Sequence, residues 1–195
     1  MSESQIPIIL ASESPRRKEM LRKLGIPFKA FHSRIDETVR FENPEKAVCD
    51  LALQKVTAYN GKNALVIGMD SLVIIGKQKL GKPANAAEAE QMLKLLSGKK
   101  HRVITGVAIS FEGRVLIESE TTYVSFRKLK LNEIRWYIKT GEVFGKAGAY
   151  AIQGLGRIFI QKIEGCYYNV IGFPVAAFQR VLLRMGVSIF DLMKQ

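Results

Sequence analysis

The sequence predicts an α/β fold built around a mixed β-sheet, on the basis of two observations. First, segments in which apolar residues recur with helical spacing alternate along the chain with short β-rich runs. Second, two long β-rich runs, residues 101–110 and 115–126, are joined at Glu112-Gly113, a dipeptide typical of a hairpin turn. The 195 residues, 47% of them hydrophobic, are enough for a core, and no linker, repeat or low-complexity segment divides them. We therefore expect a single domain over residues 1–195.

The N-terminal part of the chain is predicted to contribute two strands and two helices. The apolar run 6–11 has strand character, and Pro15, a residue suited to the first helical position, begins a helix that ends at Gly25. A short strand over 28–31 follows. A second helix over 43–59 then carries an apolar stripe on one face.

In the middle of the chain, the apolar run 65–75 is predicted to form strand structure. The helix after it is capped by Asn85, and Glu88 stands three residues later, as in a capping box. This helix continues to about residue 96, where Ser97-Gly98 ends it.

The C-terminal part combines helices with an unusual density of glycine. A helix around residues 132–139 leads into a glycine-rich stretch over 141–156. Strand character resumes over 158–163, and residues 174–185 form a final amphipathic helix.

Charge and cysteine usage narrow the class of protein. The 30 Lys and Arg against 18 Asp and Glu give a formal charge of +12, which favours an anionic partner: a nucleotide, a nucleic acid or a membrane surface. Cys49 and Cys166 are far apart, and with only His32 and His101 to help they build no recognisable zinc site. No window approaches about 18 apolar residues, so neither a signal peptide nor a membrane span is indicated. We expect a cytoplasmic protein in a reducing compartment.

An anion-binding site is predicted where the first strand meets the first helix. Ser12 and Ser14 supply hydroxyls beside the free N–H groups of the helix start. Arg16 and Arg17 stand in the first turn, where the helix dipole disfavours cations unless an anion offsets them. An ordinary capped helix with solvated arginines fits the same residues equally well.

Two charged residues interrupt apolar patterns. Lys55 lies in the buried stripe of the second helix, where it either extends its ammonium to solvent or directs it toward an anion in a cleft. Asp70 lies within an otherwise apolar strand region. It is either a turn or bulge aspartate beside Gly68, or a metal ligand or general base at a strand end.

Residues 76–82 spell most of a Walker A loop, but Pro83 follows, which offers no hydroxyl for magnesium and disfavours a helix at Lys82. We reject a P-loop. Lys82 remains either a phosphate contact or a surface hairpin lysine. Gln153 lies among glycines that permit close approach of a ligand, and its amide can donate and accept to match the edge of uracil or thymine. A structural loop amide is equally compatible.

The order of these signals along nearly the whole chain closely resembles the Maf family of nucleoside triphosphate pyrophosphatases, also known for a proposed link to septum formation. The blocks that carry the resemblance are Leu10–Arg17, Asp36-Glu37, Leu51–Lys55, Gly68–Ser71, Gly81–Pro83, Leu96–Gly98, Thr105–Ala108, Lys146–Tyr150, Gln153-Gly154 and Tyr168–Pro174.

The resemblance implies a two-lobed Maf/Ham1-like (ITPase-like) fold, with an elongated mixed β-sheet flanked by helices and a central nucleotide-binding cleft. It implies hydrolysis of a nucleoside triphosphate to the monophosphate and pyrophosphate with Mg²⁺ or Mn²⁺. By analogy with the family, we expect a homodimer. Trp136, Tyr137 and residues 173–190 are candidates for an exposed apolar patch.

By analogy with the family, Asp70 would accept the proton of the attacking water, and Glu37 with Asp70 would hold the metal. Lys55 and Lys82 would act with them in catalysis, because charge develops on the leaving pyrophosphate. The residues expected to contact the phosphates are Ser12, Ser14, Arg16, Arg17, Lys55 and Lys82.

The resemblance also bears on the base. Members resembling dTTP and UTP hydrolases carry Arg, Thr and Gln at the positions of Arg16, Ser71 and Gln153, whereas 7-methyl-GTP hydrolases carry Trp, Gln and Glu. Ser71 keeps the hydroxyl and loses the methyl group. The pyrimidine nucleotides dTTP and UTP are therefore expected, and 7-methyl-GTP is the alternative within the family.

Two functions of other classes compete with this interpretation. A basic nucleic-acid-binding module would explain the charge of +12, but no nucleic-acid-binding motif is evident and the basic residues are scattered over many elements. A non-catalytic partner in cell division would not need Lys55 in an apolar stripe.

Overall fold

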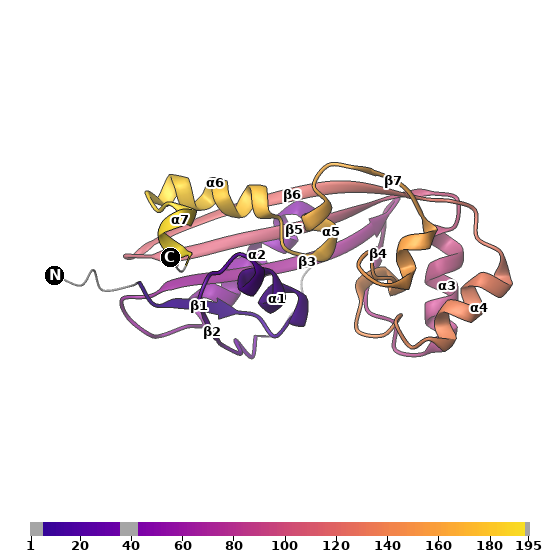
Figure 1. Ribbon diagram of the computed structural model, residues 1–195, viewed down its shortest axis with the longest axis horizontal. Helices are drawn as coiled ribbons and strands as arrows, with labels where there is room; N and C mark the ends of the chain where they lie inside the picture. Colours follow the sequence, from indigo (N-terminus) through magenta and orange to yellow (C-terminus); the bar gives the residue numbers. More distant parts are fainter. Residues whose placement is uncertain (1–5, 36–42, 194–195) are drawn as a thin grey trace. The chain divides into compact units, whose positions relative to one another are not determined.

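The computed structural model describes residues 6–35 and 43–193 of the chain (Figure 1). Its strands form a seven-stranded sheet of order β2-β1-β3-β5-β6-β7, with β4 pairing with β3. Strand β1 runs parallel to β2 and β3, whereas the β3–β4 and β6–β7 pairs are antiparallel. The expected α/β fold around a mixed sheet flanked by helices is confirmed.

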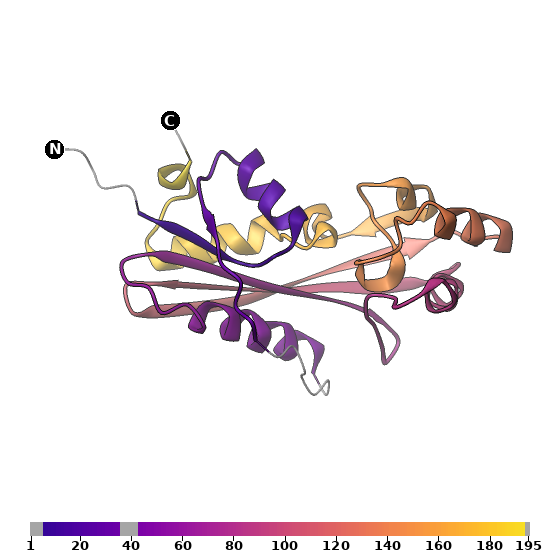
Figure 2. The same ribbon diagram turned by 90° about the horizontal axis from the view of Figure 1, so that it is seen from below.

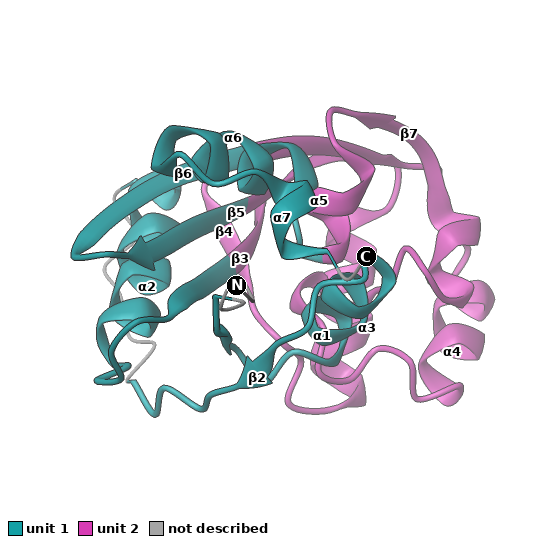
Figure 3. Cartoon of the chain, turned by 60° about the vertical axis from the view of Figure 1, so that its left-hand side comes forward, with its two compact units in different colours: residues 1–70, 105–120, 172–195 teal, residues 71–104, 121–171 magenta. Residues whose placement is uncertain are grey.

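The chain divides into two compact units, coloured separately in Figure 3. The first comprises Met1–Asp70, Thr105–Glu120 and Gly172–Gln195, and the second comprises Ser71–Ile104 and Thr121–Ile171. The long strands β3 (Leu65–Ile75), β5 (Lys100–Phe111) and β6 (Arg114–Phe126) contribute residues to both.

In the first unit, helices cover both faces of the sheet. Figure 2 shows α2 on one face and α1 and α6 on the other. The elements that lie wholly in this unit are β1 (Ile8–Ala11), α1 (Pro15–Lys23), β2 (Lys29–Ala30), α2 (Pro44–Thr57), α6 (Val175–Met185) and α7 (Ile189–Leu192). Buried residues of α2, such as Ala52 and Val56, pack on Ile9, Val66 and Ala108 of the sheet.

The second unit has a separate core rich in aromatic residues. Phe126 lies edge-on to Tyr150, and Tyr137 lies edge-on to Phe159. The elements wholly in this unit are β4 (Gln78–Leu80), α3 (Ala86–Leu96), α4 (Leu131–Lys139), the 3₁₀ helices η1 (Ala147–Ala149) and η2 (Leu155–Phe159), β7 (Ile160–Glu164) and α5 (Tyr167–Ile171).

Two glycines set the distance between α2 and the sheet. A Cβ at Gly68 of β3 would lie 2.5 Å from the carbonyl oxygen of Ala52, and one at Gly106 of β5 would lie 2.3 Å from that of Val48. Real Cβ atoms essentially never come so close. The helix backbone therefore rests directly on two neighbouring strands, which is the packing role that a glycine inside a strand can serve.

The helix starts agree with the sequence in two cases out of three. The side chains of Asn43 and Asn85 accept from the N–H groups three residues on, as expected of N-caps. The Glu88 carboxylate, however, takes the N–H of Ala84 rather than closing a capping box on Asn85. Ser14 occupies the N-cap of α1 without making a side-chain cap bond, so the ordinary capped-helix interpretation lacks its side-chain cap.

Several elements differ from the sequence-based expectation. Strand β7 begins at Ile160, because Ile158 belongs to the 3₁₀ helix η2. The short elements β4, α5 and α7 have too few residues for a periodic pattern to reveal them. The expected apolar patch is also wrong in part: Tyr137 is fully buried, whereas Trp136 is 48% exposed.

None of the helices within residues 6–35 and 43–193 is long and apolar enough to cross a membrane.

Candidate active site

The centre of the candidate site is a buried ion pair in the first unit. Lys55 on α2 places Nζ 2.6 Å from Oδ1 of Asp70 on β3, and the two side chains are only 6% and 12% exposed. Lys55 therefore does not extend to solvent, and its ammonium meets a carboxylate. Asp70 lies inside the eleven-residue strand β3, so it is neither a turn residue nor at a strand end.

The position of this pair follows from the packing of α2. Gly68 lies two residues before Asp70, and residues two apart in a strand point to the same face. Gly68 approaches Ala52, Lys55 and Val56 of the helix. The close approach at Gly68 thus brings Lys55 down to the face of β3 that carries Asp70.

The carbonyl of Met69 accepts hydrogen bonds from two cationic side chains. It accepts from Nη1 of Arg17 at 2.9 Å and from Nζ of Lys55 at 3.3 Å. Strand β1 pairs with β3 only as far as Ala11 opposite Gly68, so Met69 lies just beyond the end of that pairing. A main-chain oxygen just beyond the β1 pairing thus connects α1 with α2.

Arg17 is buried and directed at the protein itself. Its Nε donates to the carbonyl of Gly172 at 2.9 Å, and its Nη1 donates to Oγ of Ser12 at 3.1 Å in addition to Met69. One guanidinium therefore joins the helix start, β3 and the segment that precedes α6. This is the planar, multiply bonded geometry for which arginine is suited.

The segment between β1 and α1 has the features of an anion site. Ser12 Oγ accepts from the backbone N–H of Ser14 at 3.3 Å, which curls the chain before the helix. The first turn of α1 contains no acidic residue, and Arg16 stands there half-buried. The hydroxyls and the N-terminal amides of α1 thus lie together without a carboxylate in the turn to repel an anion.

Lys82 and Gln153 lie in the second unit. Lys82 is exposed between Gly81 and the buried Pro83, and the Gly81 carbonyl accepts from the N–H of Gly148 at 3.0 Å. No helix begins until Ala86, and β4 pairs back on β3. The rejection of a P-loop is confirmed, because Lys82 does not lead into a helix.

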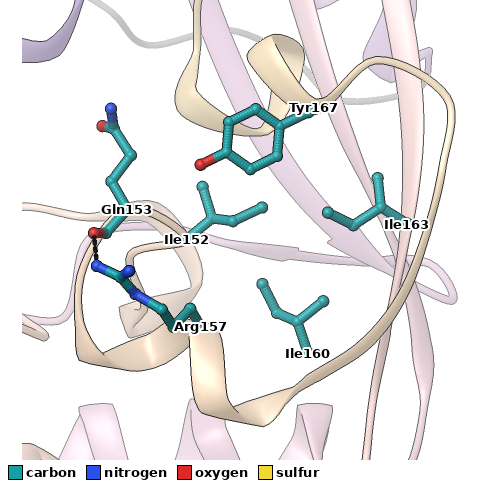
Figure 4. A pocket seen from close by; sticks show the side chains of 6 residues that line it. All are labelled: Ile152, Gln153, Arg157, Ile160, Ile163 and Tyr167. Atoms are coloured by element: carbon teal, nitrogen blue, oxygen red, sulfur yellow. Dashed lines mark hydrogen bonds between the residues drawn. The ribbon is translucent and has the colours of Figure 1, made fainter.

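Gln153 lines an open groove of about 480 Å³ (Figure 4). The groove is lined by three apolar and three polar side chains: Ile152, Ile160 and Ile163, and Gln153, Arg157 and Tyr167. The side chain of Gln153 extends from its turn on the side away from the Arg157 guanidinium. As a residue, Gln153 is half-buried.

The structure thus brings four of the predicted residues together in one unit: Ser12, Arg17, Lys55 and Asp70. Ser14 and Arg16 follow Ser12 in that unit, whereas Lys82, Gln153 and the half-buried Ser71 belong to the other. Glu37 lies outside the described residues.

The donors among the described residues are compatible with a divalent cation that a substrate helps to bind. Among the described residues, no three His, Cys, Asp or Glu side chains form a group that could hold a metal. Mg²⁺ in nucleotide enzymes is typically bound by one or two carboxylates together with substrate phosphates. Asp70 offers one such carboxylate, so the donor set is compatible with a metal that arrives with a triphosphate.

Sequence reasoning missed the contributions of the backbone. The carbonyls of Met69 and Gly172 leave no signal in a sequence, since every residue has a carbonyl. Gly68 and Gly106 do leave one, because glycine inside a strand marks close approach of another backbone.

Comparisons with known proteins agree with one another. A sequence model of the Maf family, described as Maf-like protein, matches residues 7–185. A dTTP/UTP pyrophosphatase of Bacillus cereus is 45% identical over 185 residues, which make up 93% of this chain and 97% of that protein. The dTTP/UTP pyrophosphatase of Symbiobacterium thermophilum is 45% identical over 186 residues, or 94% of this chain and 96% of that protein.

Among solved structures, that of the Staphylococcus aureus Ham1 protein aligns with 62% of this chain and 71% of its own, at 16% identity and a TM-score of 0.44. This likeness is too weak to carry an assignment.

Proposed function

The chain belongs to the Maf family, and from this premise we infer that it is a nucleoside triphosphate pyrophosphatase acting on dTTP and UTP. Water cleaves the bond between the α and β phosphates, and the nucleoside monophosphate and pyrophosphate leave. The observation that carries the proposal is the buried pair of Lys55 and Asp70 beside the start of α1. Such an activity removes unwanted triphosphates from the nucleotide pool.

Asp70 acts as the general base. Lys55 bonds to Oδ1, so we assign proton acceptance to Oδ2. The Lys55 ammonium contacts this carboxylate at 2.6 Å. It also lies where it can stabilise negative charge that develops on the phosphates as the anhydride bond breaks.

The phosphates bind at the start of α1. Ser14, Arg16 and the N-terminal amides of that helix supply the donors. Arg17, whose Nε and Nη1 reach oxygens of the protein, holds Ser12 and the Met69 carbonyl in place. We therefore assign it a positioning role in place of the phosphate contact that the sequence suggested.

We also propose that the reaction requires a divalent cation, Mg²⁺ or Mn²⁺. Asp70 and Glu37 are the residues that would hold it, and it would neutralise charge on the phosphates. Base selection belongs to the proposal as well. Gln153, with a donor and an acceptor on one amide, is complementary to the edge of uracil or thymine, and Arg16 and Ser71 complete the set.

The test is pyrophosphate release from dTTP, UTP, CTP, dCTP, ATP, GTP and 7-methyl-GTP with Mg²⁺ or Mn²⁺. We expect turnover of dTTP and UTP that falls by about 10²- to 10⁴-fold in Asp70→Asn, the range for loss of a general base. The matched control is Asp50→Asn, which alters an exposed pair with Lys46 on α2. It should keep full activity.

Each other outcome has a defined meaning. Preference for 7-methyl-GTP would keep the reaction and refute the pyrimidine assignment. No turnover of any nucleotide, together with salt-sensitive oligonucleotide binding that persists in Asp70→Asn, would favour a nucleic-acid-binding module. Thermal unfolding of both variants establishes that lost activity is not lost fold.

The proposal extends to the oligomeric state of the protein and to its cellular compartment. We propose a homodimer, for which the exposed Leu183 and Phe190 of the first unit, 61% and 69% exposed, are the candidate face. Sedimentation of Leu183→Arg against the unaltered protein tests it. The free thiols of Cys49 and Cys166 support a reducing, cytoplasmic compartment.

A further inference from the structure

The turn that carries Gln153 is fastened by a carboxylate from an earlier segment. Glu142 accepts from the backbone N–H of Leu155 at 2.9 Å through Oε2 and from that of Gly156 at 3.1 Å through Oε1. These two residues begin the 3₁₀ helix η2, directly after Gln153-Gly154. The carboxylate therefore fixes the chain on the C-terminal side of Gln153.

Tyr137 completes the fastening on the N-terminal side. Its hydroxyl donates to Oε1 of Glu142 at 2.7 Å and accepts from the N–H of Ala151 at 3.1 Å. Burial raises the pKa of Tyr137, and Glu142 raises it further, so the hydroxyl stays protonated as a donor. Burial alone would raise the pKa of Glu142, but bonds from Leu155, Tyr137 and Gly156 together lower it, so the acceptor stays ionised.

The fit between carboxylate and turn is tight. A Cβ at Gly154 would lie 2.1 Å from Oε2 of Glu142. Only a residue without a side chain allows Glu142 to pack under the turn at this position.

Arg157 fastens the same turn from the exposed side. Its Nη2 donates to the Gln153 carbonyl at 2.5 Å and its Nε to the Gly154 carbonyl at 2.7 Å (Figure 4). The main chain of Gln153 is thus held by side chains at several points, while the residue lines the groove.

Such restraint has a chemical use. A primary amide has a donor end and an acceptor end, so a freely moving glutamine can turn to suit uracil or cytosine alike. Discrimination requires that the amide meet the base at a fixed distance and direction, which requires a fixed backbone beneath it.

We propose that Tyr137 and Glu142 are positioning residues that fix Gln153 and thereby set the preference of the enzyme for UTP over CTP. The inference rests on the proposed role of Gln153 in base selection. Neither residue touches the substrate; each acts through the turn at 151–157.

The test compares kcat/KM for UTP and CTP in Tyr137→Phe, Glu142→Gln and Arg157→Ala. We expect the UTP/CTP ratio to fall by about tenfold in the first two, the factor that one lost oriented hydrogen bond provides. The fall should come mainly from a higher KM for UTP, because the hydrolytic groups are untouched. Arg157→Ala, at an exposed position, should lower the ratio in the same direction and still fold if the core variants do not.

The matched control is Glu133→Gln. Glu133 also accepts from a backbone N–H, that of Lys130, and from a side chain, Arg127, in the same unit. This variant should lower stability and leave the UTP/CTP ratio unchanged. A ratio that changes equally in Glu133→Gln, or in none of the variants at the turn, would overturn the proposal.

Gln153→Ala separates this inference from the proposed function. If Gln153→Ala lowers the ratio while Tyr137→Phe, Glu142→Gln and Arg157→Ala do not, positioning is refuted and base selection by Gln153 stands. If Gln153→Ala leaves the ratio unchanged, the role of Gln153 in base selection is refuted and this inference with it.

Discussion

Lys55 and Asp70 lie on different elements, α2 and β3, yet their charged atoms are 2.6 Å apart and almost inaccessible to water. A buried ion pair is weak evidence of stabilisation, since desolvation offsets the attraction. Its members are nevertheless mutually dependent. Removing either charge leaves the other uncompensated inside the protein.

That dependence gives the first prediction. Lys55→Met should lower the free energy of unfolding by about 3–5 kcal/mol, because the Asp70 carboxylate loses its partner. Lys46→Met breaks the exposed pair with Asp50 and should cost less than about 1 kcal/mol. Urea denaturation measures both. Equal effects of the two variants would show that the buried pair has no special energetic weight.

A second prediction concerns the guanidinium of Arg17. Arg17→Lys cannot reach Gly172, Ser12 and Met69 from one ammonium, so we expect a loss of about 2–3 kcal/mol of stability and a higher KM for the triphosphate. Arg22→Lys, an exposed change in the last turn of α1, is the control and should stay within about 0.5 kcal/mol. A fully active, stable Arg17→Lys protein would contradict the positioning role.

The third prediction tests the spacing between helix and sheet. Gly68→Ala places a methyl group against the Ala52 carbonyl, so it should cost about 1–3 kcal/mol and reduce activity by displacing Lys55. Gly81→Ala meets no atom within 4 Å, and its effect on the free energy of unfolding should be near zero or slightly stabilising. Chemical denaturation of the pair, with pyrophosphate release for Gly68→Ala, decides the matter.

The fourth prediction is a pH dependence that comes from His101. Burial lowers the pKa of His101 from 6.5 to about 4. Between these values the unfolded chain binds a proton that the folded protein does not, so stability is present at neutral pH and falls as the pH is lowered. We expect about 2 kcal/mol less stability at pH 5 than at pH 7. His101→Gln should lack this difference when urea denaturation is measured at the two pH values. If the variant loses as much unfolding free energy between pH 7 and pH 5 as the unaltered protein, the assignment is refuted.

The sequence alone predicted most long elements and the short strand β2, and it missed the short elements β4, α5 and α7. Periodicity over 44–57 and 86–96 was sufficient to identify α2 and α3, since both carry long apolar stripes with asparagine caps. A five-residue helix such as α5 shows no period. Ile158 was misassigned because a β-branched side chain does not exclude a 3₁₀ turn.

At the site, residue type identified the charged groups but not their partners. Lys55 and Asp70 stand out because each interrupts an apolar pattern. No local pattern shows that they bond to each other, since they lie 15 positions apart on two different elements. The same limit explains Arg17, which resembles a phosphate ligand at a helix start but donates to main-chain and hydroxyl oxygens.

The contact of α2 with Gly68 and Gly106 constrains how this protein can be altered. A fold usually tolerates exchanges in its core as long as total volume is kept. Here the volume available at two positions is that of a hydrogen atom, and the helix they admit carries Lys55, to which we assign a role in catalysis. Neither design for a more rigid core nor neutral substitution can enlarge the side chains at these positions without displacing Lys55. The packing of the sheet and the proposed reaction are therefore constrained together.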